Sequence, residues 1–223
     1  MTGSYSDAYP TFTRAERIAD GVMHFLGMAL AITGAVLLIV LSAGHRPGLT
    51  VAAVAVYGGA MILSFVVSAC YHMTPWERAR PMLRRMDHAA IYLKIAGTYT
   101  PLVALIGTAF GWIVLAVVWA LAMMGAVLRL FVSRAPGRFN TLLYLALGWF
   151  SLALIWPLAQ RLPAGGTALI VVGGLLYSAG TIFFSWEKLR FQNAIWHGFV
   201  LAASGCFFAA IAWGVTLQVP GPL

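Results

Sequence analysis

The chain has 223 residues, of which 61% are hydrophobic and only 9% are charged. A soluble domain carries about 25% charged residues, so this composition excludes an ordinary water-soluble fold and indicates a protein that lies in lipid. The net charge of +8 is compatible with nucleic-acid binding. However, the basic residues stand in short segments between apolar runs, where they orient helices and contact anionic headgroups. We therefore expect membrane lipids as partners and no nucleic-acid partner.

The first 20 residues are polar and lead directly into a full-length apolar run. A cleavable signal peptide has a short apolar region and a small-residue cleavage site, so we interpret the first run as a retained helix. Apolar runs of about 20 residues, long enough to cross a bilayer, recur along the chain, separated by proline, glycine and charge. The predicted spans are 21–43, 50–72, 87–107, 111–132, 140–160, 166–186 and 194–217.

These spans predict an all-α integral membrane protein, a bundle of seven transmembrane helices at 21–217. Residues 1–20 form a cytoplasmic N-terminal segment and residues 218–223 a short external tail. Lys and Arg concentrate in the segments on the N-terminal side, whereas the other side receives only Arg46 and Arg161. By the positive-inside rule the N-terminus is cytoplasmic and the C-terminus lies outside.

The few polar side chains within the spans stand where four helices begin or end on that cytoplasmic side. Ser68 and His72 are four residues apart and share a helix face, as do Asn193 and His197. The topology brings these residues to one depth near the inner leaflet. The residues concerned are Asp20 and His24 of the first span, Ser68 and His72 of the second, Asp87 and His88 of the third, and Asn193 and His197 of the seventh.

Two imidazoles, His72 and His197, and the carboxylate of Asp87 are suitable ligands for zinc. Three protein ligands and an open position lower the pKa of bound water to about 7, which makes hydroxide available at neutral pH. Ser68 beside such a site would hold the water or an oxyanion. This pattern favours a hydrolytic centre that faces lipid.

Other interpretations of the same residues stay open. A single histidine near a helix end, such as His24 or His88, is usually interfacial, and Asp87 at a helix start interacts favourably with the helix dipole. Lys94, in the middle of a span, either snorkels to the interface or has a partner between helices, and Pro101 bends its helix. Ionisable residues inside spans are nonetheless costly and usually functional.

Three motifs resemble those of the hemolysin III family of bacterial membrane proteins. They are SACYH (68–72), MDHAAIYLKIAGTYTP (86–101) and AIWHGFVLAAS (194–204). That family belongs to the progestin and adipoQ receptor group, which is related to the alkaline ceramidases. The resemblance implies a multi-pass protein of the bacterial inner membrane, with a zinc site near the cytoplasmic face.

The resemblance also implies roles for individual residues. Ser68 and His72 match the S-x3-H motif, Asp87 matches an aspartate that acts through zinc-bound water, and His197 matches the second histidine of H-x3-H. Asn193 stands in place of the first histidine, and Phe207 in place of a further histidine of that helix. Asparagine is a poor substitute for imidazole around zinc. Zinc is therefore bound weakly, or a neighbour such as His24 or His88 completes the site, or the cluster is held by hydrogen bonds alone.

The leading hypothesis is a zinc-dependent hydrolase that acts on a lipid amide or ester. Asp87 would be the general base or water-orienting group, Ser68 would support the oxyanion, and His72 and His197 would hold the metal. The alternatives are a non-enzymatic lipid sensor or receptor, or a membrane-homeostasis protein, with a structural or absent metal. A pore is not expected, because no helix carries a polar stripe along its full length.

Overall fold

The computed structural model describes residues 12–132, 137–186 and 188–217. In these residues seven helical spans are long and apolar enough to cross a membrane, which confirms the predicted number. The elements are α1 (Arg14–Ala43), α2 (Gly48–Met73), α3 (Arg80–Ile106), α4 (Ala109–Val127), the π-helical turn η1 (Leu128–Val132), α5 (Gly137–Trp149), the 3₁₀ turn η2 (Phe150–Leu154), α6 (Ile155–Ala159), α7 (Ala164–Phe184) and α8 (Gln192–Leu217). The fourth span includes η1, and α5, η2 and α6 together make the fifth.

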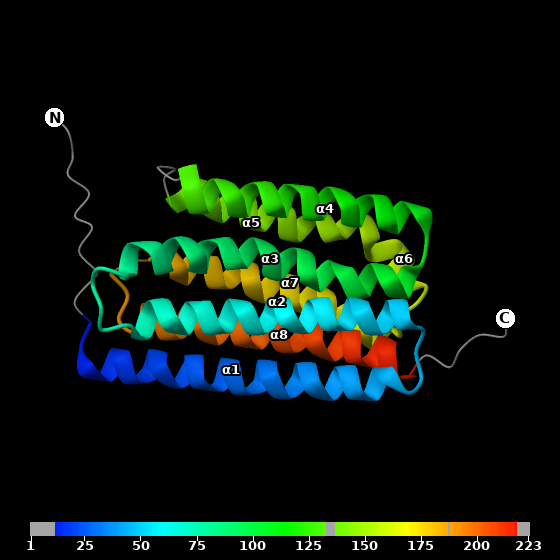
Figure 1. The fold of residues 1–223 in the computed structure, drawn as a ribbon, viewed down its shortest axis with the longest axis horizontal. Coiled ribbons are helices and arrows are strands. Elements are labelled where there is room, and N and C mark those ends of the chain that lie inside the picture. The colour runs from blue at the N-terminus through cyan, green and yellow to red at the C-terminus, as the bar shows by residue number, and fades with distance from the viewer. Residues whose placement is uncertain (1–11, 133–136, 187, 218–223) are drawn as a thin grey trace.

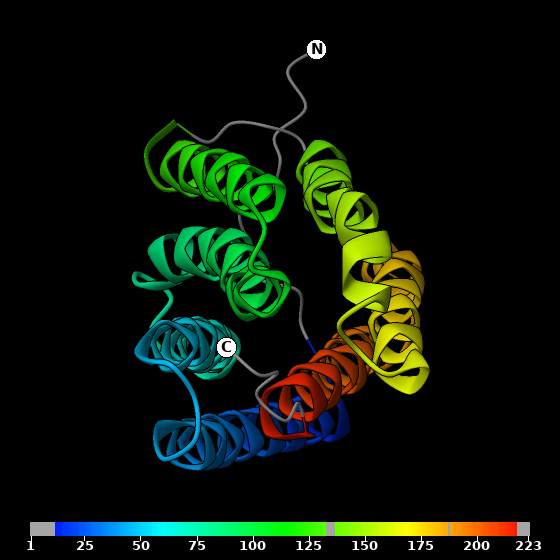
Figure 2. The same cartoon turned by 90° about the vertical axis from the view of Figure 1, so that its right-hand side faces the viewer.

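The helices run side by side along the long axis of the molecule (Figure 1). Helices α1 to α4 follow one another as neighbours, α8 lies against α1 and α7, and α5 returns beside α3 (Figure 2). Helix α8 contacts α1, so the first and last helices of the chain are adjacent. Side chains at the start of α1, the end of α2 and the start of α8 therefore meet at one end of the bundle.

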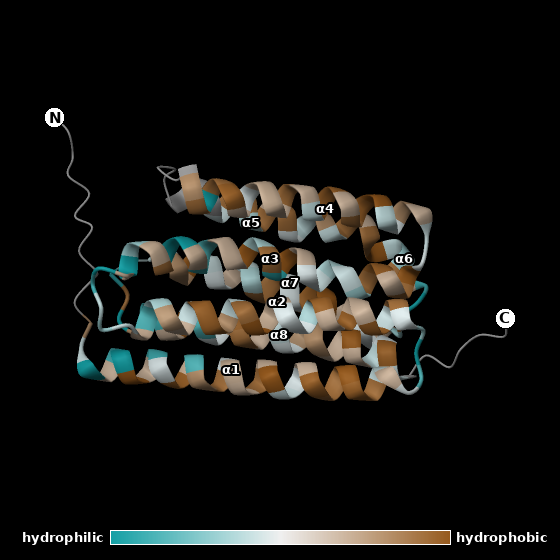
Figure 3. Ribbon diagram, viewed as in Figure 1, coloured by the Kyte–Doolittle hydropathy of each residue, from teal (hydrophilic) through white to brown (hydrophobic). Residues whose placement is uncertain are grey.

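That end is the more hydrophilic one, while the helices are largely apolar along the rest of their length (Figure 3). Large apolar side chains such as Phe25, Phe131 and Trp156 are exposed along the helices. Exposed apolar side chains on a helical bundle are expected where the surrounding solvent is lipid. The basic residues of the segments joining α2 to α3 and α7 to α8 lie at this same end, which we call the basic end.

Helix α3 begins at Arg80, seven residues before the predicted span start at Asp87. The polar run from Arg80 to Arg85 is helical because it continues the third span beyond its apolar part, with Pro81 in the first turn where its missing N–H costs nothing. Asp87 therefore lies beyond the first turn of α3, and its interpretation as a charge at the helix start is wrong. Helix α1 similarly begins at Arg14, inside the segment predicted to precede the bundle.

Helix α3 is the central helix of the bundle, with the largest buried share of the seven spans. Its Gly97 allows close approach to α2, since a Cβ at that position would lie 2.5 Å from the Cβ of Ala60. Small residues at such contacts are the usual means by which helices associate in lipid. Pro101, also in α3, is fully buried within the helix. The tight α2–α3 pair fixes the relative positions of the polar residues that both helices carry.

Candidate metal centre

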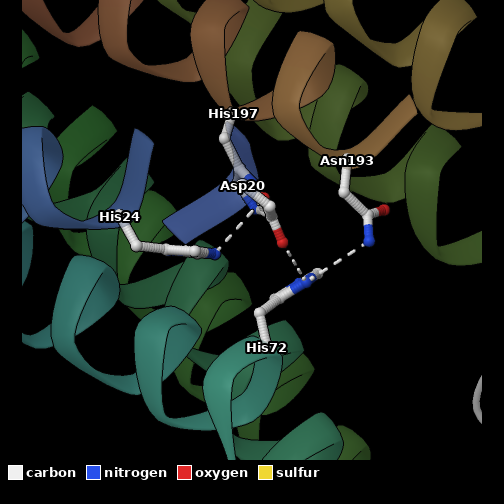
Figure 4. A network of polar contacts seen from close by, with 5 residues as sticks. All are labelled: Asp20, His24, His72, Asn193 and His197. Carbon is white, nitrogen blue, oxygen red and sulfur yellow. Dashed lines mark hydrogen bonds and ion pairs between the residues drawn. The ribbon is translucent and has the colours of Figure 1, made fainter. Parts of the chain in front are cut away.

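Four side chains from three helices converge near the basic end of the bundle (Figure 4). Asp20 and His24 lie one turn apart on α1 and face the interior. His72 lies in the last turn of α2, and His197 lies in the second turn of α8. Asp20 and His24 are 4% and 2% exposed, so both are withdrawn from solvent and from lipid.

The carboxylate of Asp20 is at the centre of the group. Its Oδ1 lies 2.6 Å from Nδ1 of His197 and 3.6 Å from Nε2 of His24, and its Oδ2 lies 3.1 Å from Nδ1 of His72. Each carboxylate oxygen thus accepts from a different imidazole when those Nδ1 atoms carry protons. The three rings are also in mutual contact in tilted or edge-on arrangements, with centroids 4.3 to 5.0 Å apart.

The donor set and its geometry fit a metal ion. Each of the four residues offers one ligand atom, and these atoms lie within 4.8 Å of one another. Nε2 of His24 is buried and has no hydrogen-bond partner among the described residues, so it can act as a ligand when the ring carries its proton on Nδ1. Imidazole and carboxylate are suitable ligands for zinc, which binds nitrogen at about 2.0–2.1 Å, so a shift of the side chains by about 1 Å would close the site.

Asn193, the residue that replaces the expected histidine, lies beside the group. Its Nδ2 is 3.5 Å from Nδ1 of His72 (Figure 4). An amide at this position contributes no imidazole lone pair. The structure brings His24 into the place of a third imidazole, next to His72 and His197.

Asp87 and Ser68 form a separate pair next to the four-residue group. The Ser68 side chain is a hydrogen-bonding neighbour of the Asp87 carboxylate, and that carboxylate interacts electrostatically with His72 and His197. Asp87 is not a member of the group whose ligand atoms lie within 4.8 Å of one another. The structure thus offers one carboxylate inside the candidate metal group and a second carboxylate beside it.

His88 is directed to a different part of the bundle. Its Nδ1 accepts a hydrogen bond of 3.0 Å from Nε of Arg129, which lies in the π-helical turn η1. The hydroxyl of Tyr144 on α5 donates to the backbone carbonyl of His88. His88 therefore links α3 to the fourth and fifth spans, and the structure does not bring it into the metal group.

A small cavity reaches the group from the basic end. Its volume is about 10 Å³, and its lining includes Asp20, His72 and Asn193 together with Glu16 and Arg17 from the first turn of α1. A cavity of this size has room for about one water molecule. Phe12, Arg17 and Met73 also line a wider surface hollow, so the two spaces are neighbours. The cavity thus has room for one water molecule beside the carboxylate of Asp20.

Comparison with known proteins places the chain in a family. A family model described as haemolysin-III related matches residues 12–208. This chain belongs to the haemolysin-III related family. Hemolysin-3 of Bacillus cereus is 40% identical over 202 residues, which cover 90% of this chain and 92% of that protein. The hemolysin-3 homolog of Bacillus subtilis (strain 168) is 36% identical over 202 residues, covering 90% and 94%. The family predicted from three sequence motifs is confirmed, and this member is a multi-pass membrane protein.

Among the residues of the group, Asp20 had no predicted role. The sequence places Asp20 and His24 four residues apart, the same spacing as between Ser68 and His72. That spacing was the available signal, because two polar residues on one face of an apolar helix must find polar partners. The contact with His197 spans 177 residues of sequence and becomes visible only when α8 packs on α1.

Proposed function

We propose that this haemolysin-III related protein binds zinc with His24, His72 and His197 and hydrolyses a lipid amide or ester. The observation that carries the proposal is the second carboxylate, Asp87, which lies beside the imidazoles without belonging to the ligand group. A hydrolytic metal site needs a general base that lies near the metal but does not ligate it. A bound zinc ion would supply a water of lowered pKa and polarise the scissile carbonyl.

The residues of the chain then have distinct roles. Asp20 accepts from Nδ1 of His72 and of His197 and so fixes the orientation of both rings, as carboxylates next to ligating histidines commonly do. Asp87 accepts the proton of the attacking water, and Ser68 donates its single O–H to that carboxylate and so orients it. Water reaches the group through the cavity lined by Asp20 and Asn193.

The distribution of charge supports a location at the inner leaflet of the bacterial cell membrane. The group lies at the basic end of the bundle, and by the positive-inside rule this end is cytoplasmic. A reporter phosphatase fused after residue 217 should be active outside the cell. A fusion that is expressed but inactive would reverse the orientation and place the site on the outer leaflet.

A second function is favoured by the carboxylate inside the group. If Asp20 binds the ion directly, zinc has four protein ligands, and four-coordinate sites closed by protein are structural. The protein would then be a lipid sensor or receptor whose helices the metal holds together. The two functions differ in whether Asp20 orients the imidazoles or ligates the metal.

The test begins with metal content. The full chain, purified in a mild uncharged detergent without chelator, should contain close to one zinc per molecule by elemental analysis, and His72→Ala/His197→Ala should contain none. A folded wild type without zinc would overturn the metal site. The loaded protein is then incubated with a short-chain ceramide as the amide and a diacyl phosphatidylglycerol as the ester, and released fatty acid is measured by mass spectrometry.

Asp87→Ala separates the two functions. In the hydrolase this variant keeps its zinc and loses fatty-acid release, whereas Met82→Ala, a change at an exposed residue of the same helix, keeps both. Release that is unchanged in Asp87→Ala would contradict the assigned role. Zinc retention with saturable lipid binding and no product in the wild type would establish the sensor.

A further inference from the structure

The wider surface hollow at the basic end lies between the start of α1 and the end of α2, and we call it the α1–α2 hollow. Its volume is about 440 Å³, within the range of about 300–1,000 Å³ that small-molecule sites occupy. Arg14, Arg17 and Ile18 share one face of α1, at spacings of three and four residues. The remaining lining residues are Phe12 and Met73, so the hollow combines two guanidinium groups with apolar surface.

The positive charge of the α1–α2 hollow is not neutralised by the described residues. No carboxylate among them lies within ion-pair distance of Arg14 or Arg17. Glu16, which stands between the two arginines, accepts instead from the backbone N–H groups of Thr13 and Phe191. None of the residues that line the hollow is acidic. Its charge therefore fits an anionic group of a ligand.

An apolar face of α1 continues from the hollow toward the middle of the membrane. Ile18, Val22 and Phe25 recur at helical spacing, and their side chains are 57%, 46% and 68% exposed. On a membrane-spanning helix such a face contacts acyl chains. A ligand that meets both the arginines and this face carries an anionic headgroup and acyl chains, which is the chemistry of an anionic lipid.

The hollow adjoins the candidate metal group. Phe12, Arg17 and Met73 line both the hollow and the small cavity, and the cavity also borders Asp20 and His72. Arg17 precedes Asp20 by three residues, which is about 4.5 Å along the helix axis. In a glycerophospholipid the ester carbonyls lie on the glycerol carbons next to the phosphate, on its membrane side. A phosphate held at Arg17 therefore brings those esters to the depth of the metal group.

We propose that the α1–α2 hollow binds the headgroup of an anionic glycerophospholipid, with its phosphate held by Arg14 and Arg17. Guanidinium groups pair with phosphate through two parallel hydrogen bonds, so arginine suits this role. The acyl chains lie along Ile18, Val22 and Phe25. Binding of the headgroup does not require the metal. Only the next step, in which the bound lipid supplies the ester for hydrolysis, rests on the proposed function.

The binding test compares an anionic with a zwitterionic lipid on the purified full chain in an uncharged detergent. Native mass spectrometry with dioleoyl phosphatidylglycerol or dioleoyl phosphatidylcholine added gives the dissociation constant of the first bound lipid. We expect phosphatidylglycerol to bind about tenfold more tightly, the order of effect that two basic residues have near anionic lipid. Arg14→Gln/Arg17→Gln should remove most of this preference.

Arg78→Gln/Arg85→Gln is the matched control. It removes the same charge from two exposed arginines of the basic end that do not line the hollow, and it should keep the wild-type preference. An equal loss in both double variants would assign the preference to the net charge of this end and overturn the site. Equal affinities of wild type for the two lipids would overturn it as well. If the first double variant does not fold, Arg17→Gln against Arg78→Gln gives the same comparison.

Glycerol 3-phosphate distinguishes a lipid from a soluble phosphate ester. It carries the anionic group without acyl chains, so a large molar excess should not displace bound phosphatidylglycerol. Displacement would assign the hollow to a soluble phosphate ester and overturn the proposal of a lipid ligand.

Fatty-acid release tests the proposed function separately. If the bound lipid is the substrate, Arg14→Gln/Arg17→Gln should raise KM for phosphatidylglycerol severalfold, with little change in kcat and with wild-type zinc content. Arginine-dependent binding without fatty-acid release from any lipid would contradict the hydrolase and leave the headgroup site intact. Fatty-acid release that is equal for both lipids, without a binding preference, would support the hydrolase and overturn the headgroup site.

Discussion

Two buried polar layers of this bundle share helices α2 and α8 and yet carry charges of opposite sign: an outer layer around Asp20 near the basic end, and an inner layer around Lys94, two turns beyond Asp87 on α3. The outer layer, near the basic end, gathers lone pairs: a carboxylate from Asp20 and three imidazoles within 4.8 Å. The inner layer gathers donors around Lys94, with hydroxyls and aromatic rings but no described carboxylate at ion-pair distance. Both are buried polar clusters, so polarity alone does not identify a ligand. The acceptors around Asp20 fit a cation, whereas the Lys94 ammonium already contacts the Ser204 hydroxyl and the rings of Phe65 and Tyr177.

The largest expected effect comes from removing the carboxylate of the outer layer. We expect Asp20→Asn to weaken zinc binding by roughly 100-fold or more, because loss of even an outer partner of a metal ligand typically costs 10–100-fold. Asparagine keeps the side-chain size and removes the charge that faces His72, His197 and His24. Affinity is measured by competition with a chromophoric chelator.

Lys94→Met is the control for that change, since Lys94 lies two turns from the outer layer and contacts none of its four residues in the described structure. Its zinc affinity should equal that of wild type. An equal loss of zinc affinity in Asp20→Asn and Lys94→Met would show that the two layers are one coupled site. It would contradict the separation of the two layers.

A smaller effect is expected where the two layers share a packing contact. Gly27 lies one turn beyond His24 on α1, and a Cβ there would stand 2.6 Å from the ring of Phe65, which faces Lys94. Gly27→Ala should destabilise the protein by about 1–3 kcal/mol, the usual range for overpacking a filled interior. The measurement is thermal or denaturant unfolding in detergent.

Gly59→Ala is the matched variant, because a Cβ at Gly59 meets nothing within 4 Å. Alanine favours helix over glycine, so this change should be neutral or slightly stabilising. If both substitutions lower stability equally, helix propensity or lipid contact controls the effect. The close contact between Gly27 and Phe65 would then contribute nothing to the loss of stability.

Much of this architecture was accessible from sequence, for physical reasons that differ between residues. The number of spans follows from the lengths of the apolar runs, which can be read from consecutive residues. The motif around His72 is also formed by consecutive residues. The partners of Lys94 were not accessible, since Ser204 is 110 residues away and reaches it only through helix packing. The start of α3 was missed because polar arginines in the first turns of a span look like a loop, although they continue the helix beyond its apolar part.

The same distinction between local and distant contacts applies at the start of α1. Thr13 and Glu16 form a capping box: Oε2 of Glu16 accepts from the backbone N–H of Thr13 at 2.8 Å, and Thr13 Oγ1 accepts from the N–H of Glu16. The other carboxylate oxygen of Glu16 accepts from the N–H of Phe191 at 3.1 Å, 175 residues away. Phe191 directly precedes α8 and has φ of 60°, a left-handed conformation that is unfavourable for a bulky residue.

This contact joins the beginnings of the two helices that carry Asp20 and His197, so it should contribute to their alignment. Thr13→Ala removes one cap bond and should cost about 1 kcal/mol of stability, the usual value for an N-cap. Glu16→Ala should cost more than Thr13→Ala and should also weaken zinc binding, because it releases Phe191 as well. Glu16→Gln retains a capping-box acceptor and should resemble wild type in both measurements.

Zinc affinity that is unchanged in Glu16→Ala, with the same loss of stability as Thr13→Ala, would mean that α8 is positioned by its packing on α1 and α7 alone. The contact at Phe191 would then be a consequence of that packing and not one of its causes.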